Sequence, residues 1–334
     1  MGGHRLLVPI FSGQGSSLST LTSYVDCLPA DSRHGLTLMT MCYEAFIEEL
    51  SELSSPELSK IGVDLQDFRS PDALLSMWLS HFFHNPVMSS SALLLVQLLR
   101  YLSFVERFGL EEGSLTPFSE LLQSYSTSRV GVLGFSSGIL PACVVAASSS
   151  MASYLSLALE AYRLSLWIGI RCQLCRSSTS NTESTAPWSF VLIGISPEAA
   201  QEAILDFTKK RSDSLHIEDP SGLYITAVID DSCVTVSGSP TLLAEFSAKL
   251  SSLFGPSVVS QSTSVDTLYH SPLHLESTRD KVLSDVSRRN IRFPTIHNLL
   301  VPVRSTSTGV ALDASSLPNL PNDPRFCNSL STCS

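Results

Sequence analysis

Short apolar runs that stop at glycine mark two places in this 334-residue chain. One run covers 6–11 and stops at the Gly-Gln-Gly of 13–15, and the other covers 129–134 and stops at 135–138. An apolar run of this length that ends at glycine is typical of a buried strand followed by a tight turn. We therefore predict two buried strands, each of which leads into a sharp loop.

Helical spacing dominates the stretch that separates the two runs and continues beyond the second. Phe46 and Leu50 fall on one face of a predicted helix, and 93–102 forms another, strongly apolar helix. The stretch 139–158 carries no charge over roughly twenty residues, a length that can span a membrane. Because Pro141 and three serines interrupt this stretch, we predict a buried helix of an α/β protein rather than a membrane span.

The pattern of hydrophobic and polar residues changes at residue 189. Short β-branched runs alternate there with two helical stretches, each of which opens with Ser-Pro, the pairing of an N-cap residue with proline at the first helical position. Strand, helix, strand, strand, helix and strand follow one another at 189–195, 197–211, 223–229, 233–237, 240–254 and 257–264. This order is that of a ferredoxin-like α+β unit. We predict a small subdomain at 189–262 and a larger one built from 1–188 and 263–334.

The composition is that of a folded protein with few charges, 43% hydrophobic and 16% charged. The 31 acidic and 21 basic residues give a net charge of −10, opposite in sign to that of most nucleic-acid-binding proteins. The apolar run at the N-terminus is too short for a signal peptide. The one C-x-x-C pair, Cys172 and Cys175, has no second pair at zinc-binding distance. We expect reduced thiols in a cytoplasmic protein that binds no nucleic acid, membrane, metal or cofactor.

Gly134, Ser136 and Gly138 form a G-x-S-x-G pattern at the end of the second predicted strand. In this pattern the small flanking residues allow a strained turn from strand to helix, which lifts a nucleophile clear of the sheet. The helix that follows also directs free backbone N–H groups and the positive end of its dipole to the place where an oxyanion would form. The alternative is a plain serine-rich turn, but the flanking strand and helix favour Ser136 as a nucleophile.

A serine nucleophile needs a base from elsewhere in the chain. His270 directly precedes Ser271 and Pro272, which start another predicted helix. At that position the helix dipole favours the neutral imidazole that a general base requires. His274, one turn further on, is a second candidate. Gln14, in the loop after the first strand, either directs a backbone amide at the same site or belongs to a plain turn.

The three motifs at 11–15, 134–138 and 269–273 together resemble, in order and spacing, the acyl-carrier-protein acyltransferases of fatty acid and polyketide synthesis. The phenylalanine before the nucleophile and the Tyr-His-Ser-Pro run are most similar to the starter-unit acyltransferase domain of fungal non-reducing polyketide synthases. This resemblance covers about 5–309. It implies an α/β-hydrolase-like large subdomain with an inserted ferredoxin-like small subdomain, in agreement with the elements predicted above.

The resemblance also implies a role for each matching residue. Ser136 would be the nucleophile, His270 its base, and the backbone amides of Gln14 and Ser137 the oxyanion hole. The family works with a dyad whose histidine is oriented by backbone, so no acidic residue is needed. Transfer would be ping-pong: an acyl thioester, supplied as acyl-CoA or by a fatty acid synthase or reducing polyketide synthase, acylates the serine. The phosphopantetheine thiol of an acyl carrier protein, next to other polyketide synthase domains, then takes the acyl group.

Two further positions concern the substrate. Malonyl-specific relatives hold the substrate carboxylate with an arginine on the helix after the elbow, and Ile168 stands in that arginine's place. Because an unpaired carboxylate in an apolar pocket is costly, the resemblance implies a neutral acyl chain. Trp167 and Ile168 would line the acyl pocket, the alternative being ordinary core packing. For docking an acidic carrier protein, the basic clusters at 209–211 and 288–292 are the candidates.

The chain departs from the family pattern in two ways. Most starter-unit domains carry cysteine where this chain has Ser136, whereas the wider superfamily uses serine. The resemblance fades after Gly309, and 317–334 is expected to be an unstructured tail in place of a longer C-terminal part.

Two other functions fit the same residues. A serine esterase or thioesterase of α/β-hydrolase type would need an acid between Ser136 and His270, and Asp230, Asp231 and Asp266 are candidates in the required order. A catalytically inactive, truncated domain would only dock a carrier protein or a partner synthase.

Overall fold

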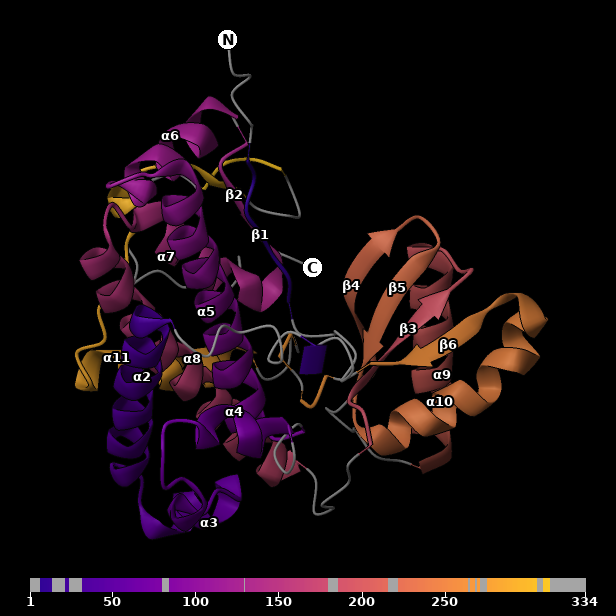
Figure 1. Cartoon of the computed structure of the whole chain (residues 1–334). Coiled ribbons are helices and arrows are strands. Elements are labelled where there is room, and N and C mark those ends of the chain that lie inside the picture. Colours follow the sequence, from indigo (N-terminus) through magenta and orange to yellow (C-terminus); the bar gives the residue numbers. More distant parts are fainter. Residues whose placement is uncertain are drawn as a thin grey trace.

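The structure is a computed structural model that describes residues 7–13, 22–23, 32–79, 84–128, 130–179, 186–215, 222–263, 265–267, 269–270, 275–304 and 309–312. Figure 1 shows two lobes, one rich in helices and one built on a four-stranded sheet. The buried hydrophobic residues form two separate clusters, one from 11–170 and 282–303 and the other from 190–250. Each lobe therefore has a core of its own.

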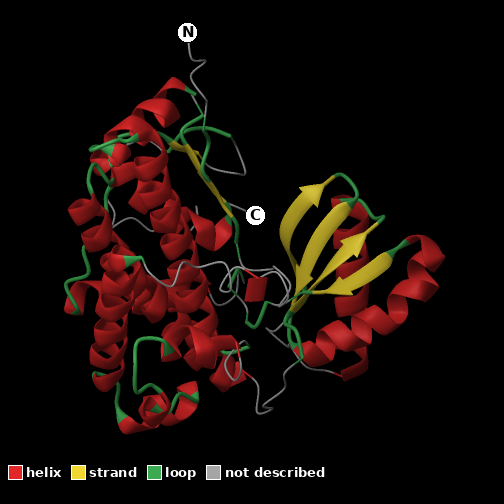
Figure 2. Cartoon of the chain, in the orientation of Figure 1, coloured by secondary structure: helices red, strands yellow, loops and turns green. Residues whose placement is uncertain are grey.

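A short parallel sheet organises the large lobe (Figure 2). Strand β2 (Val132–Gly134) lies between β1 (Ile10–Phe11) and β7 (Val303–Arg304). Phe11 pairs with Gly134, so the carboxyl ends of β1 and β2 lie side by side. Both predicted strands are confirmed, although each is shorter than the apolar run that predicted it.

Two long helices supply much of the large core. Helix α5 (Pro86–Glu112) packs against α8 (Met151–Thr179). Among the described residues, α5 is the one helix long and apolar enough to cross a membrane, and 78% of its apolar stretch is buried inside the protein, as in a core helix. The uncharged stretch 139–158 is not one helix, because α7 (Ile139–Ala147) ends at three serines before α8 begins.

Shorter helices surround this pair. They are α2 (Arg33–Ser51), α3 (Ser55–Ile61), α4 (Ala73–Met77), α6 (Pro117–Thr127) and α11 (Leu275–Arg288). Polar N-caps start two of the helices: Ser32 Oγ accepts from the backbone N–H of Gly35 before α2, and Asn85 Oδ1 accepts from that of Val87 before α5. Helix α2 buries Phe46 and Leu50, as their spacing predicts.

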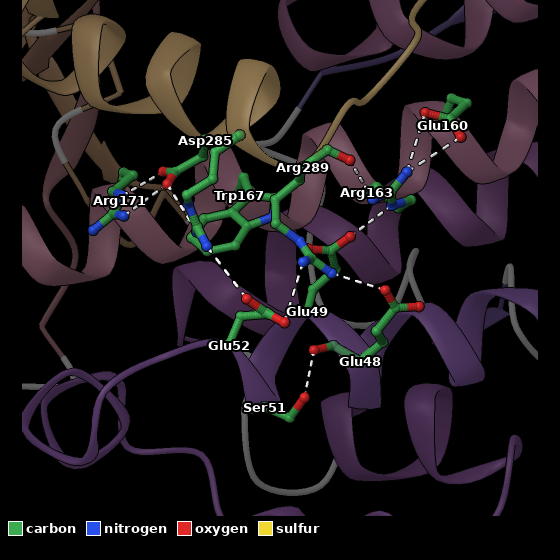
Figure 3. Close-up of polar contacts among 11 residues, drawn as sticks. Glu48, Glu49, Ser51, Glu52, Glu160, Arg163, Trp167, Arg171, Asp285 and Arg289 are labelled. Carbon is green, nitrogen blue, oxygen red and sulfur yellow. Dashed lines mark hydrogen bonds and ion pairs between the residues drawn. The ribbon is translucent and has the colours of Figure 1, made fainter.

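A buried carboxylate joins α2, α8 and the residue that directly follows α11 (Figure 3). Glu49 of α2 is fully buried and accepts hydrogen bonds from Arg163 Nε at 2.6 Å, Arg289 Nε at 2.7 Å and Trp167 Nε1 at 2.9 Å. Burial raises the pKa of Glu49, but the hydrogen bonds from Trp167, Arg289 and Arg163 outweigh burial and hold the pKa below its usual value. The carboxylate stays charged inside the protein because it is paired on both oxygens.

The small lobe is an antiparallel sheet with two helices on one face. Strands β3 (Ser189–Ile193), β4 (Tyr224–Asp230), β5 (Cys233–Ser237) and β6 (Val259–Ser262) lie in the order β4-β5-β3-β6, and helices α9 (Pro197–Leu215) and α10 (Pro240–Phe254) cover one side. Phe190 of the sheet packs against Phe246 of α10. The first strand lies between the third and the fourth, which is the ferredoxin-like arrangement predicted from the sequence.

Candidate active site

Ser136 stands at a sharp turn directly after β2. Its backbone has a φ of 51°, in the left-handed region that residues with a side chain rarely adopt. The turn continues as a short 3₁₀ segment, 136–138, that leads into α7. Strain of this kind persists where surrounding structure imposes it, and it is often found at functional sites. The observed succession of strand, strained serine and helix is the nucleophile elbow that the G-x-S-x-G pattern predicts.

The two glycines of the pattern are required by close approach. A Cβ atom on Gly134 would lie 2.4 Å from the carbonyl oxygen of Gly138, and one on Gly138 would lie 2.3 Å from the carbonyl oxygen of Phe11. Neither position has room for a side chain. The elbow is therefore packed tightly against the end of β1.

His270 lies beside the elbow, although 134 residues separate it from Ser136 in the sequence. Its Nε2 is 3.1 Å from Ser136 Oγ, a hydrogen-bond distance. Burial lowers the pKa of His270 below its usual value, which favours the neutral imidazole. The other ring nitrogen, Nδ1, is buried and has no hydrogen-bond partner among the described residues. His270 can thus accept the proton of Ser136, whereas His274 lies outside the described residues.

No described acidic residue completes a triad. Asp230 and Asp231 are exposed in the turn between β4 and β5, where Asp230 accepts hydrogen bonds from Ser232. Asp266 is buried, but its Oδ2 accepts a hydrogen bond from Ser89 of α5. Burial raises the pKa of Asp266 to about 6, against the lowering effect of the hydrogen bonds and of Arg176. Ser136 and His270 therefore form a dyad within the described part of the chain.

The surroundings of Ser136 include groups for an oxyanion hole. Ser137 lies in the first turn after the nucleophile, where backbone N–H groups have no partner within the helix. Gln14, the other predicted donor, lies outside the described residues. Gly13, directly before it, is described: a Cβ on Gly13 would lie 2.9 Å from Ser136 Cβ. The chain that leads into Gln14 is therefore in contact with the nucleophile.

Trp167 and Ile168 differ in their surroundings. Trp167 is fully buried, donates to Glu49, and has the guanidinium carbons of Arg171 and Arg288 at 5.3 and 5.1 Å from its ring centroid (Figure 3). These contacts give the indole a structural role between helices and do not support it as an acyl-pocket residue. Ile168 is partly exposed and packs against the large core, and its place in an acyl pocket stays a prediction.

Two buried polar residues near the site, Gln97 and Ser89, were not singled out from the sequence. Gln97 of α5 donates to the carbonyl oxygen of Ser12 at 2.6 Å, and Ser89 donates to Asp266. Gln97 is the one polar residue in the otherwise aliphatic run 93–99, and that isolation was the available signal. Asp266 was considered only as a triad acid.

Comparison with known proteins assigns the chain to a family. Residues 34–270 match the model of the family described as "Starter unit:ACP transacylase in aflatoxin biosynthesis". The orsellinic acid synthase armB of Armillaria mellea is 41% identical over 317 residues, which are 93% of this chain and 14% of that protein. The orsellinic acid synthase of Beauveria bassiana is 30% identical over 93% of this chain and 13% of that protein. The chain spans about a seventh of the length of these relatives.

Solved structures show the same fold at low sequence identity. The malonyl CoA-acyl carrier protein transacylase of Clostridium perfringens is 12% identical with a TM-score of 0.55, over 98% of this chain and 78% of that one. The loading acyltransferase of the avermectin modular polyketide synthase is 17% identical with a TM-score of 0.53, over 97% and 78% of the two chains. The mixed α/β fold predicted from the sequence is confirmed.

Fold and family together define a transacylase, an enzyme that moves an acyl group to an acyl carrier protein. The chain belongs to the starter unit:ACP transacylase family, and the proteins similar to it include orsellinic acid synthases and a non-reducing polyketide synthase of Elsinoe fawcettii. The resemblance identified from three short motifs is thus confirmed.

Proposed function

We propose that this chain takes a neutral starter acyl group from a thioester onto Ser136 and passes it to the phosphopantetheine thiol of a polyketide synthase carrier protein. The observation that supports the proposal most strongly is the 3.1 Å contact between Ser136 Oγ and His270 Nε2 at a strained elbow. An inactive docking domain would have no need of this geometry.

The reaction proceeds in two half-reactions with the same groups. His270 Nε2 accepts the hydroxyl proton as Ser136 Oγ attacks the thioester carbonyl. Backbone N–H groups of Ser137 and Gln14 stabilise the tetrahedral oxyanion. When the C–S bond breaks, the thiolate takes the proton from His270 and an acyl-serine ester remains. The carrier thiol then gives its proton to His270 and attacks the ester, and Ser136 Oγ leaves with the proton that His270 returns to it.

A serine ester is lower in energy than the thioester from which it forms. Deacylation to a thiol is therefore uphill, and it depends on the base and on the oxyanion hole, each of which lowers the barrier by ~3 kcal/mol. A cysteine at this position, which the resemblance gives to most starter-unit domains, would form a thioester and make the same step nearly neutral in energy. The low pKa that burial gives His270 is useful here, since the imidazole is neutral and ready to accept the thiol proton.

The preference for a neutral acyl group rests on the cations of α8. Ile168 stands where the resemblance places an arginine in malonyl-specific relatives. The two neighbouring arginines are both engaged: Arg163 with Glu49 at 2.6 Å and Arg171 with Asp285 at 2.6 Å. Neither guanidinium is available to a substrate carboxylate. A substrate carboxylate beside Ile168 would therefore have neither of these two cations as a partner, and an unpaired buried carboxylate costs several kcal/mol.

The proposed partners are an acyl carrier protein, a thioester donor and neighbouring synthase domains. One similar structure, at 14% identity and a TM-score of 0.52, is a malonyl transacylase in complex with a type II polyketide synthase acyl carrier protein. Of the two basic clusters, the one at 288–292 is a poor docking site, because Arg288 and Arg289 are paired with Glu52 and Glu49. Lys209 and Lys210 are exposed on α9, where Lys210 makes only an exposed pair with Asp206, and we assign carrier docking to them.

Intact-protein mass spectrometry tests the proposal. The protein is incubated with acyl-CoA donors of different chain length and with malonyl-CoA, and then with a holo carrier protein. We expect a neutral acyl adduct on the wild type that passes to the carrier, and no adduct on Ser136→Ala. Ser137→Ala is the matched control, since it removes the adjacent hydroxyl but keeps both backbone N–H groups. Release of free acid instead of transfer would favour the hydrolase function, and a folded protein without an adduct would favour the docking domain.

A further inference from the structure

Gln97 is a buried amide in an apolar stretch of α5. Its side chain is 9% exposed, and its neighbours along the helix, Val96 and Leu98, are fully buried. A buried amide is costly unless it is hydrogen-bonded. Gln97 Nε2 donates to the carbonyl oxygen of Ser12 at 2.6 Å, across 85 positions of sequence. The side chain of Gln97 is therefore bonded to the segment that follows β1.

That segment lies against the nucleophile elbow. A Cβ on Gly13 would lie 2.8 Å from the carbonyl oxygen of Phe135 and 2.9 Å from Ser136 Cβ. A Cβ on Gly138 would lie 2.9 Å from the carbonyl oxygen of Ser12, the same atom that Gln97 binds. The Ser12–Gly13 peptide is thus enclosed by the elbow on one side and by Gln97 on another.

Helix α5 supports this region at a second point. Tyr101, one helical turn after Gln97, packs its ring against that of Phe11 at a centroid distance of 6.2 Å. The elbow segment 136–138 also packs against α5. One face of α5 therefore packs against both the end of β1 and the segment that begins with Ser136. On that face, Gln97 makes the hydrogen bond to Ser12.

We propose that Gln97 is a positioning residue of the active site, whose side-chain amide holds the Ser12–Gly13 peptide against the nucleophile elbow. A carbonyl that accepts a hydrogen bond fixes the orientation of its peptide plane. That orientation sets the course of the chain into the predicted oxyanion-hole loop and the packing around Ser136. Small displacements of such groups reduce rates by large factors. The inference rests on the proposed function of Ser136.

The test compares two variants that each delete one buried hydrogen bond to a backbone carbonyl. Gln97→Met keeps the approximate volume but removes the donor to Ser12. Tyr154→Phe is the matched control, because it deletes the buried hydroxyl that donates to the carbonyl oxygen of Leu98 on α5 at 2.7 Å but keeps the ring that packs against Tyr101. Both are measured for the rate of Ser136 acylation by an acyl-CoA, for KM, for Tm and for amide hydrogen exchange of residues 7–13.

We expect Gln97→Met to slow acylation at least tenfold with KM changed less than threefold, and to raise exchange in residues 7–13. Tyr154→Phe should lower Tm by a similar amount while acylation stays within twofold of the wild type. Equal acylation rates in wild type and Gln97→Met, or unchanged exchange in residues 7–13, would overturn the inference alone. A folded wild type that forms no adduct on Ser136 would overturn the proposed function and this inference with it.

Discussion

Ser136 Oγ lies 3.1 Å from His270 Nε2, and the serine reaches this position with a backbone φ of 51°. The two residues come from separate parts of the large lobe: Ser136 from the turn after β2, and His270 from the segment that precedes α11. Ser136 is thus held at a strained turn, and tertiary structure brings His270 beside it.

The first prediction concerns the pH dependence of acylation. Because burial lowers the pKa of His270, the imidazole stays neutral to below its usual value of 6.5. The rate of acyl-enzyme formation should therefore be more than half its maximum at pH 6.5 and fall to half its maximum at a lower pH. Rapid-quench mass spectrometry across pH 5 to 8 measures this profile, and His270→Ala should be slow at every pH. Half-maximal acylation above pH 6.5 would show that the buried imidazole is not the base.

The second prediction concerns Asp266 and stability. Burial raises the pKa of Asp266 to about 6, so between its usual value and pH 6 the folded state binds more protons than the unfolded state. The free energy of unfolding therefore loses a contribution as the pH rises through this range. Asp266→Asn has no such loss and should gain up to about 3 kcal/mol relative to the wild type between pH 4 and pH 7.5.

Urea unfolding at the two pH values measures this difference. Asp231→Asn, at an exposed position in the β4–β5 turn, is the matched control and should follow the wild type at both. The account of Asp266 is wrong if Asp266→Asn tracks the wild type as closely as the control does.

The third prediction concerns the buried carboxylate of Glu49. Glu49→Gln keeps the shape but leaves Arg163 and Arg289 without their buried counter-charge, and we expect a loss of about 3 kcal/mol in the free energy of unfolding. Glu48→Gln removes a carboxylate that is 67% exposed and should cost less than about 1 kcal/mol. Chemical denaturation of both variants gives the comparison, and equal losses would contradict the role of Glu49.

The fourth prediction concerns acyl selectivity. Ile168→Arg places a cation where the chain now has an apolar side chain, and it should allow a malonyl adduct on Ser136 while reducing the neutral acyl adduct at least tenfold. Ile168→Met, which conserves volume and charge, should retain the neutral preference. Competition between the two CoA esters, read by intact mass, decides this point. If Ile168→Arg and Ile168→Met give the same ratio of adducts, Ile168 does not line the acyl pocket.

Much of the fold could be predicted from local patterns in the sequence. The hairpin β4–β5, the Ser-Pro starts of α9 and α10, and the two strands that end at glycine were all predictable, because turn chemistry and apolar runs act over a few residues. Strand length was not: β1 and β2 both begin several residues later than their apolar runs, and Gly131, directly before β2, has a φ of 78° that is outside the strand region. The break between α7 and α8 shows the same limit: the serines were visible, but only packing determines whether a helix bends or ends there.

The site was predictable to the extent that its residues stand in short motifs. Ser136 and His270 were found from the elbow pattern and from the helix start that follows the histidine. Trp167 was assigned to an acyl pocket from its position on a helix, whereas its actual contacts depend on Glu49, far away in sequence. Gln97 and Ser89 have no motif, and their partners, Ser12 and Asp266, are known only from the folded chain.

The most direct test of the account is the location of the acyl group. The wild type is incubated with an acyl-CoA, digested at low pH to preserve the ester, and mapped by tandem mass spectrometry. The account predicts a single acylated residue, Ser136, and loss of the adduct in Ser136→Ala but not in Ser137→Ala. An acyl group on Ser137 or on a cysteine, or persistence of the adduct in Ser136→Ala, would contradict it.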